Sequence, residues 1–288
     1  MTDFSTRLDD FRKVFAQMVV ARAGCPDRQI LRAFERVPRH AFIGAGPWFV
    51  TEHGDSTASA DPALAYQDVA MALAPERGIT TGLPSLHARC IAACALEGGE
   101  RVVHIGTGAG YFTAILAELV GPRGRVVAYE IDELLAARAT ELLRSFPNVT
   151  VESTSGVTDL GSDVDLIYVC AGMQQIPREW LEALAPGGRA ALPLTPGNDE
   201  GAVLLVTRAG DRQVFDARFI CAARFIPCIG AEDAEAAERL AVAFRSGSRD
   251  RVRSLRLVTD SAQPDDTAWF VGDSWWLSTA ARTQTREP

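Results

Sequence analysis

The sequence has no run of about twenty apolar residues, the length that an α-helix needs to cross a bilayer. Charged residues, among them Asp3, Asp9 and Lys13, precede the first apolar stretch, which is not the pattern of a secretory signal peptide. We therefore expect no membrane partner.

Positive charge is also scarce. The chain has 29 Lys and Arg against 37 Asp and Glu, for a net charge of −8. Proteins that bind nucleic acid usually present an excess of positive charge to the phosphates. No nucleic-acid partner is expected.

The six cysteines include no Cys-x-x-Cys pair, and most of them lie in apolar runs, where a thiol behaves as a small hydrophobic group. This usage indicates a reducing compartment, and we expect the cytoplasm. Cys90 and Cys94 would share one helix face, but no further ligand stands nearby, so no metal site is expected.

What the sequence does have is a stretch from Glu100 to Phe112 around which the chain is organised. It predicts a strand over 101–105, a turn built on three alternate glycines, and a helix over 111–120. Glycine allows positive φ and lets the backbone approach a ligand closely, while the helix start directs free N–H groups toward it. The expected ligand is a nucleoside cofactor.

A second strand, over 124–130, ends on Glu130, about twenty residues after the last of these glycines. A carboxylate at that place can accept hydrogen bonds from both hydroxyls of a ribose. The dinucleotide fingerprint needs its third glycine one residue later than Gly110. The spacing therefore favours S-adenosylmethionine over NAD.

Strands and helices alternate through the middle of the chain, which predicts an α/β fold with a mainly parallel sheet and helices on both faces. The other expected helices cover 4–23, 28–36, 85–95, 132–144 and 178–184. The other expected strands cover 149–152, 165–170 and 190–194, with a turn at 185–189 and a closing hairpin over 203–208 and 214–222.

We expect three regions: an N-terminal helical and lid region over 1–75, a cofactor-binding domain over 76–224, and a C-terminal extension over 225–288. Residues 44–62 show no periodicity, which indicates either a lid or substrate wall or a mobile surface loop. The extension predicts a helix over 232–244 and ends in three tryptophans, which we expect to pack against the core or a partner chain.

Several short motifs follow one another in a characteristic order: Val37-Pro38-Arg39 with Phe42, Tyr66-x-Asp68, Thr80-Thr81-x-x-Pro84 with His87-Ala88, the glycine loop with Tyr111, Ile176-Pro177, and Pro186-Gly187-Gly188-Arg189 with Pro193. Together they resemble the protein-L-isoaspartate O-methyltransferase family from residue 28 to residue 222. The resemblance implies a Rossmann-like, S-adenosylmethionine-dependent methyltransferase fold with seven strands, the last antiparallel, preceded by N-terminal helices and followed by the extension. It also implies esterification of the α-carboxylate that isoaspartyl residues expose, which begins the repair of damaged proteins.

The same resemblance assigns site residues by position. The cofactor site would include Ile79, Thr80, Thr81, Gly82, His87, His104, Gly106, Gly108, Gly110, Glu130, Ile131, Ser155 and Gly156. Glu130 would hold the ribose, residues 155–156 would lie at the adenine edge, and residues 79–82 with His87 would line the methionine end. The candidate catalytic residues are Thr80, Thr81 and Asp68. A local turn at Tyr66 to Asp68 and a solvent-facing His87 remain open alternatives.

Three positions depart from the family pattern. Gly82 stands where the family has a serine that helps orient the carboxylate, His104 where an acid closes the first strand, and Ser155 where an aspartate is usual. Loss of such a hydrogen bond or charged partner costs about 1–3 kcal/mol when nothing compensates. Thr80 or Thr81 is a candidate source of the missing hydroxyl.

The leading hypothesis is an O-methyltransferase that acts on a carboxylate of a peptide, a protein or a small molecule, as a monomer or homodimer. A carboxylate is already ionised at neutral pH, so no general base is required. The departures and the extra tail leave open a tailoring methyltransferase of a biosynthetic peptide or metabolite. A second alternative is a non-catalytic binding protein that kept the fold, whereas an NAD-dependent oxidoreductase lacks its glycine spacing.

Overall fold

The computed structural model describes residues 4–44, 46–52, 55–59, 61–197, 199–210 and 213–282. Contacts divide the chain into two compact units, Met1–Thr154 and Ser155–Pro288. Within the described ranges, no helix is both long and apolar enough to span a bilayer. The expected three regions, 1–75, 76–224 and 225–288, stay a prediction.

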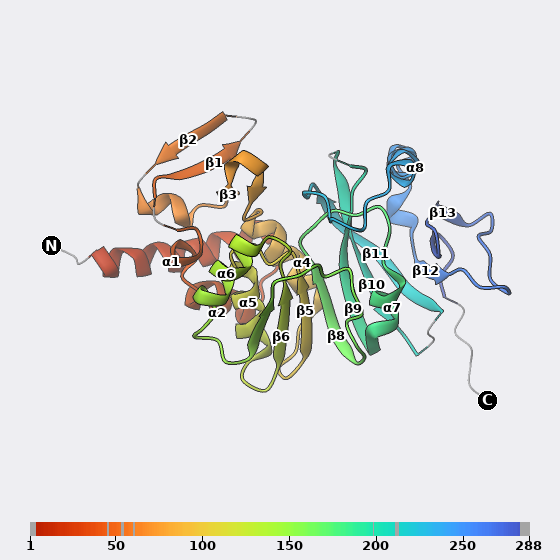
Figure 1. Ribbon diagram of the computed structural model, residues 1–288, viewed down its shortest axis with the longest axis horizontal. Helices are drawn as coiled ribbons and strands as arrows, with labels where there is room; N and C mark the ends of the chain where they lie inside the picture. The colour runs from red at the N-terminus through yellow and green to blue at the C-terminus, as the bar shows by residue number, and fades with distance from the viewer. Residues whose placement is uncertain are drawn as a thin grey trace. The chain divides into compact units, whose positions relative to one another are not determined.

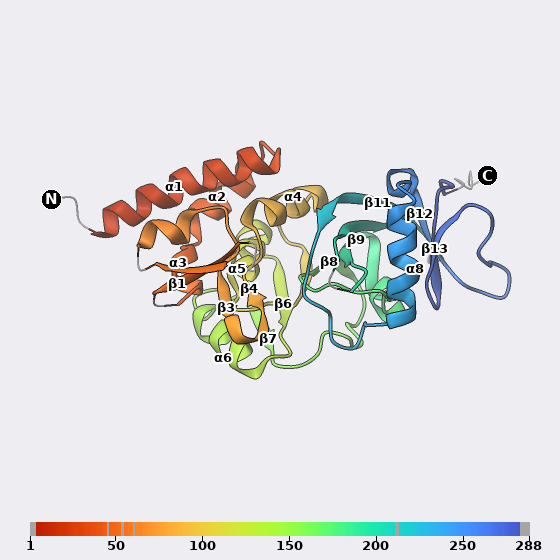
Figure 2. The same ribbon diagram turned by 90° about the horizontal axis from the view of Figure 1, so that it is seen from above.

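The first unit opens with three helices, α1 (Phe4–Ala23), α2 (Arg28–Arg36) and α3 (Arg39–Phe42). Helix α2 begins after Asp27 because its carboxylate accepts hydrogen bonds from the first free N–H groups, those of residues 29 and 30. Helices α1 and α2 pack side by side, as Figures 1 and 2 show. The helices expected here are therefore confirmed.

The stretch from 44 to 62 is not the loop that its lack of periodicity predicted. Strands β1 (Trp48–Glu52) and β2 (Asp55–Ser59) pair antiparallel, from Trp48 opposite Ser59 to Glu52 opposite Asp55. A 3₁₀ turn, η1 (Pro62–Tyr66), follows. Residues 45, 53, 54 and 60 lie outside the described part of the chain, and the lid or wall role stays a prediction.

A small two-stranded sheet and a helix lead into the central part of the first unit. Its strands are β3 (Ala72–Ala74) and β4 (Ile79–Thr80), antiparallel and joined through η2 (Pro75–Arg77). Helix α4 (Pro84–Cys94) follows, with Ser85 in its first turn.

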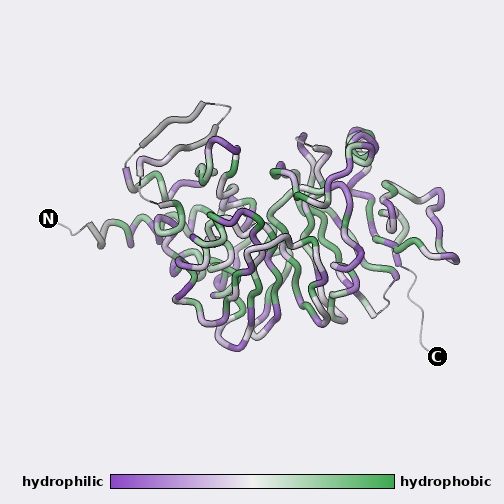
Figure 3. The backbone as a smooth tube through the Cα atoms, viewed as in Figure 1, coloured by the Kyte–Doolittle hydropathy of each residue, from purple (hydrophilic) through white to green (hydrophobic). Residues whose placement is uncertain are grey.

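The expected strand, turn, helix and strand around the glycines are all present in the first unit. Strands β5 (Arg101–Ile105), β6 (Arg125–Tyr129) and β7 (Val149–Glu152) pair in parallel, in the order β5-β6-β7. Helices α5 (Tyr111–Val120) and α6 (Glu133–Leu142) connect them. Most of α5 is buried, and the hydrophobic colouring in Figure 3 follows this core.

The second unit contains seven paired strands in the order β8-β9-β10-β11-β12-β14-β13. Among the strands of this unit that the structure describes, β8 and β9 pair in parallel and the other neighbours pair antiparallel, because short connections join most of the later neighbours. The strands are β8 (Val164–Val169), β9 (Leu184–Leu194), β10 (Gly201–Arg208), β11 (Val214–Ala223), β12 (Ser254–Leu257), β13 (Ala268–Val271) and β14 (Trp275–Ser278). The helices are α7 (Arg178–Ala183), α8 (Ala234–Arg245) and the 3₁₀ turn η3 (Arg249–Arg251).

The α/β class is as predicted, but two details of the prediction are wrong. The strands number more than seven, since the first unit has three parallel strands and the second has seven. Their pairing is mixed rather than mainly parallel. The turn expected at 185–189 lies inside β9, where the register moves from Leu184 opposite Val164 to Arg189 opposite Leu166.

The C-terminal extension accounts for the additional strands. Strand β12 pairs with β11, β14 pairs with β12, and β13 pairs with β14. Trp275 and Trp276 of β14 are 0% and 2% exposed. Trp269 of β13 packs its ring 5.2 Å from that of Phe219 and 5.3 Å from that of Phe244. The tail therefore continues the strands of its own unit.

Candidate functional site

The glycine loop has the backbone that its sequence predicted. Gly106, Gly108 and Gly110 have φ values of +78°, +57° and +94°, which residues with a Cβ rarely adopt. The N–H groups of residues 106 and 107 donate to the carbonyl of Tyr129, at 3.0 and 3.2 Å, and so fix the loop to the end of β6. A Cβ on Gly110 would lie 2.8 Å from Leu143 Cδ1, so that position also lacks room for one.

Glu130 lies directly against this loop. Its carboxylate accepts hydrogen bonds from the N–H of Gly108 at 2.6 Å and of Asp132 at 3.0 Å. The residue is 7% exposed, and burial raises its pKa above the usual range, although the N–H donors and the charge of Arg77 oppose that rise. Ile131, next along the chain, is 46% exposed.

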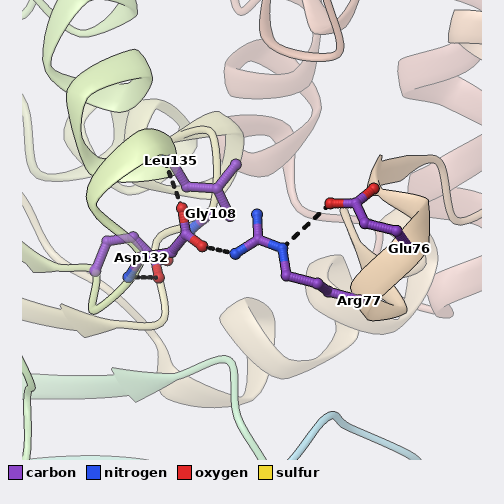
Figure 4. A network of polar contacts seen from close by, with 6 residues as sticks. Glu76, Arg77, Gly108, Asp132 and Leu135 are labelled. Carbon is purple, nitrogen blue, oxygen red and sulfur yellow. Dashed lines mark hydrogen bonds and ion pairs between the residues drawn. The ribbon is translucent and has the colours of Figure 1, made fainter.

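A polar network borders the same loop. Arg77 of η2 forms ion pairs with Glu76, at 3.3 Å, and with Asp132, the N-cap of α6, as Figure 4 shows. Asp132 in turn accepts a hydrogen bond from the N–H of Leu135 at 2.9 Å. The network therefore ties η2 to the helix that follows Glu130.

The two candidate catalytic threonines are held differently. Thr81 Oγ1 accepts hydrogen bonds from the N–H of Met71 at 3.0 Å and from Arg39 at 3.2 Å, and donates to the carbonyl of Gly82 at 3.1 Å. Its hydroxyl thus holds the polypeptide in place. Thr80 Oγ1 accepts one bond, from the N–H of Gly82, at 3.3 Å.

Asp68, the third candidate catalytic residue, stabilises the start of α4. Its carboxylate accepts a hydrogen bond from the N–H of Ser85 at 2.8 Å and forms an ion pair with Arg22 at 3.2 Å. A carboxylate at a helix N-terminus satisfies free N–H groups and interacts favourably with the helix dipole. These contacts give Asp68 a structural role in the described protein.

Two buried histidines lie close to the glycine loop and to residues 79–82. His87 is 2% exposed and stacks on Phe112, with ring centroids 3.8 Å apart. His104 is fully buried, and its Nδ1 lies 2.8 Å from Thr113 Oγ1. Burial lowers the pKa of both imidazoles to about 3, so both are uncharged at neutral pH.

Of the candidate site residues, the structure brings together those of the first unit. Phe112 connects the glycine loop with His87, and Leu73 Cδ1 of β3 lies 3.3 Å from the place that a Cβ of Gly108 would take. Ser155 and Gly156 belong to the second unit. There Ser155 Oγ accepts from the N–H of residue 157 at 3.1 Å, and the carbonyl of Gly156 accepts from the indole N–H of residue 180 at 3.0 Å.

Sequence reasoning assigned no role to the side chain of Arg39, which the structure buries completely within the first unit. Arg39 is fully buried and donates to the carbonyls of Ala65, Gln67 and Val69 at 2.6–3.1 Å, besides the hydroxyl of Thr81. Burial lowers its pKa to about 10, so it remains charged at neutral pH. The Val37-Pro38-Arg39 motif marked this residue in the sequence but did not predict its hydrogen bonds.

The residues present fit a nucleoside cofactor. The loop has glycines where the backbone can approach a ligand, and a carboxylate stands at the end of the neighbouring strand. Thr107 Oγ1, inside the loop, is buried and has no hydrogen-bond partner among the described residues. A buried hydroxyl of this kind usually binds a partner, and a ligand in the loop would supply one.

Comparison with known proteins identifies the family. The model of the family "Protein-L-isoaspartate(D-aspartate) O-methyltransferase (PCMT)" matches residues 18–233. The chain belongs to this family.

Individual relatives of the family agree with this match. The chain is 34% identical to the protein-L-isoaspartate O-methyltransferase of Bradyrhizobium sp. (strain ORS 278) over 221 residues, 75% of this chain and 93% of the relative. It is also 34% identical to the enzyme of the same name from Syntrophotalea carbinolica, over 76% of this chain and 93% of the relative.

Solved structures show the same fold. A structure of protein-L-isoaspartate O-methyltransferase superposes with a TM-score of 0.65 at 21% identity, covering 94% of this chain and 88% of the other. A Plasmodium falciparum protein described as a putative family member, in complex with S-adenosyl-L-homocysteine, gives a TM-score of 0.60 at 17% identity, covering 75% of this chain and 97% of the other. Residues 234–288 lie beyond the family match.

Proposed function

We propose that this family member transfers a methyl group from S-adenosylmethionine to the carboxylate that isoaspartyl residues expose in peptides and proteins. The observation that carries the proposal is the family match over residues 18–233, which includes the glycine loop, Glu130 and residues 79–82. The named relatives are all protein-L-isoaspartate O-methyltransferases, which favours repair over a tailoring or non-catalytic role.

Several groups of the first unit would bind the cofactor. Glu130 would accept the ribose hydroxyls, and residues 106–110 would let the backbone approach, with Thr107 Oγ1 as a further donor or acceptor. Uncharged His104 replaces an acidic partner, so we expect hydrogen bonding rather than an ion pair there. Cytoplasmic location and a monomeric or homodimeric state remain part of the proposal.

The acceptor side requires orientation more than acid-base chemistry. When bound, S-adenosylmethionine supplies a methyl group on a positively charged sulfur. An isoaspartyl carboxylate is ionised at pH 7 and needs no base. The chain must therefore hold it in line with the methyl group and exclude water. His87 and His104 are both uncharged at neutral pH. Neither therefore adds a positive charge that would draw the carboxylate out of line with the methyl group.

The direct test measures transfer of labelled methyl to matched peptides that differ only in isoaspartate or aspartate. We expect base-labile methyl on the isoaspartyl peptide and none on its partner. Methylation of neither peptide, with S-adenosylhomocysteine binding intact by calorimetry, would refute the proposed acceptor.

The cofactor assignment is tested with Glu130→Gln. Loss of the charged acceptor weakens hydrogen bonds to the ribose, so we expect the Kd for S-adenosylhomocysteine to rise about tenfold. The matched control is Glu133→Gln, an exposed acid in the first turn of α6, which leaves the Kd unchanged. Equal Kd values for both variants would remove Glu130 from the site.

A further inference from the structure

The β3–β4 hairpin, residues 72–80, meets the glycine loop and the start of α6 at two separate points. Leu73 of β3 brings its Cδ1 to 3.3 Å from the place that a Cβ of Gly108 would take. Arg77 of η2 forms its ion pair with Asp132, the N-cap of α6 (Figure 4). The hairpin is therefore held both at its first strand and at its turn.

The two residues that the hairpin contacts are the same two that hold Glu130. The N–H of Gly108 donates to one carboxylate oxygen of Glu130 at 2.6 Å, and the N–H of Asp132 donates to the other at 3.0 Å. Burial raises the pKa of Glu130, and the positive charge of Arg77 opposes that rise, so the guanidinium lies within electrostatic reach of the carboxylate. A ribose bound to Glu130 would therefore lie beside the hairpin.

The ion pair at the turn of the hairpin has the properties of a contact that can open. The side chain of Arg77 is 43% exposed and that of Asp132 is 13% exposed, so water reaches the pair. An ion pair of this kind contributes little free energy and is screened by salt. The other acid that pairs with Arg77, at 3.3 Å, is Glu76, which belongs to η2 itself. The pair with Asp132, by contrast, joins the hairpin to another segment.

We propose that the Arg77–Asp132 ion pair is a latch that holds the β3–β4 hairpin beside the ribose of the bound cofactor and opens when the cofactor enters or leaves. Arg77 and Asp132 are positioning residues, since they act through the hairpin and not on the reacting atoms. This inference rests on the cofactor part of the proposed function and is independent of the methyl acceptor.

The rates of cofactor exchange test the latch. They are measured by surface plasmon resonance with S-adenosylhomocysteine on the immobilised full-length protein. In Arg77→Gln we expect the association and dissociation rate constants to rise together, each about two- to fivefold, the range that an exposed ion pair accounts for. The Kd changes little, because the latch closes the site in the free and in the bound protein alike. A rise in the dissociation rate constant alone would overturn the latch.

Asp132→Asn removes the charge but keeps the N-cap, because asparagine caps helices as well as aspartate does. It should raise both rate constants as Arg77→Gln does, and the double variant should go no further, since each change opens the same latch. Additive increases would contradict the inference. The matched control is Glu76→Gln, which removes the acid that pairs with Arg77 within η2 and should leave both rate constants unchanged.

Ionic strength provides a second test that uses the native protein. Salt weakens a partly exposed ion pair, so both rate constants of the native protein should rise with salt concentration. Those of Asp132→Asn should stay constant, because its latch is already open. An equal salt dependence in the two proteins would refute the latch.

The possible outcomes separate this inference from the proposed function. Equal rate constants in the native protein and both single variants would overturn the latch and leave the proposed function standing. A native protein that binds no S-adenosylhomocysteine by calorimetry would overturn the latch and the cofactor assignment together. A native protein that binds it but methylates no isoaspartyl peptide would overturn the proposed acceptor alone, and the rate constants would still decide the latch.

Discussion

At the scale of single residues, burial rather than a neighbouring charge sets most of the unusual chemistry of the first unit. His87, His104 and Glu130 all lie near the glycine loop, and for each of them desolvation is the largest cause of its shifted pKa. Burial favours the neutral form of each group. The site therefore presents uncharged histidines beside a carboxylate that the N–H groups of Gly108 and Asp132 hold in place.

The two histidines make stability depend on pH. Their pKa falls from an ordinary value of 6.5 to about 3 in the folded protein, so the unfolded chain binds more protons between these values. The histidine contribution is thus fully present above pH 6.5 and is lost as the pH falls toward 3. By linkage each histidine would cost roughly 2 kcal/mol of stability at pH 5.

We therefore expect the urea midpoint of the native protein to be lower at pH 5 than at pH 8. His87→Gln removes one of the two titrating groups, and so the difference between the two midpoints should shrink. The comparison of variant with native protein isolates the histidine from carboxylates such as Glu130. An identical pH dependence in the two proteins would contradict the assignment of a buried, neutral His87.

At the scale of elements, a few residues join segments that are far apart in the sequence. Arg39 of α3 connects the backbone of residues 65–69 with Thr81, next to β4. Arg77 of η2 connects with the N-cap of α6. Since both arginines act on segments that carry candidate site residues, the geometry of the site depends on them.

Arg39→Lys should destabilise the protein although the charge is kept. Lysine cannot donate in the forked pattern of a guanidinium, so buried carbonyls lose their donors at a cost of about 1–3 kcal/mol each. The matched control, Arg36→Lys in α2, changes an exposed residue paired with Glu118 and should have little effect. Denaturant unfolding measures both, and equal stabilities would show that the Arg39 network is dispensable.

Helix α5 offers a matched pair of glycines, one at each end. Gly110 and Gly121 both have positive φ, but a Cβ on Gly110 meets Leu143 at 2.8 Å whereas one on Gly121 meets nothing within 4 Å. Gly121 has φ +66° and ψ −171°, a backbone region that essentially only glycine adopts, so Gly121→Ala should cost about 1–3 kcal/mol from backbone strain alone. Gly110→Ala should add roughly 1–3 kcal/mol of overpacking. Equal losses of unfolding free energy in the two variants would mean that the Leu143 side chain moves aside at no cost.

At the scale of the whole molecule, the extension beyond the family match is part of the fold. Residues 234–288 contribute α8 and three strands to the second unit, and β12 covers the edge of β11 that the family match leaves unpaired. An exposed strand edge leaves backbone N–H and C=O groups unpaired, and an exposed tryptophan places a large apolar surface in water. The extension therefore stabilises the unit it belongs to.

Trp275→Ala tests this contribution in the full-length protein. A fully buried tryptophan replaced by alanine loses about 3–5 kcal/mol. Trp269→Ala, at a partly exposed position, should lose less. Far-UV circular dichroism in denaturant compares the two, and a larger loss at Trp269 would refute the packing described for β14.

The elements with strong local signals were predictable from the sequence. Alternate glycines after an apolar strand and Glu130 at a strand end act through their own backbone or close neighbours. The α/β class and the family followed from the order of such signals. The hairpin at 48–59, the extra strands and the mixed pairing did not, because strand pairing depends on partners remote in the sequence.

Only the tertiary structure decided what the polar side chains of the site do. Thr81 and Asp68 are catalytic candidates in the sequence, and only the fold shows their neighbours: Met71 and Arg39 donate to Thr81, and the N–H of Ser85 donates to Asp68. Only the fold likewise shows that a Cβ on Gly82 would lie 2.4 Å from Nε2 of His87, five residues further along the chain. The sequence by itself determined the backbone that approaches a ligand, since glycine conformation is local. Burial and the neighbours of each side chain required the fold, since they come from distant segments.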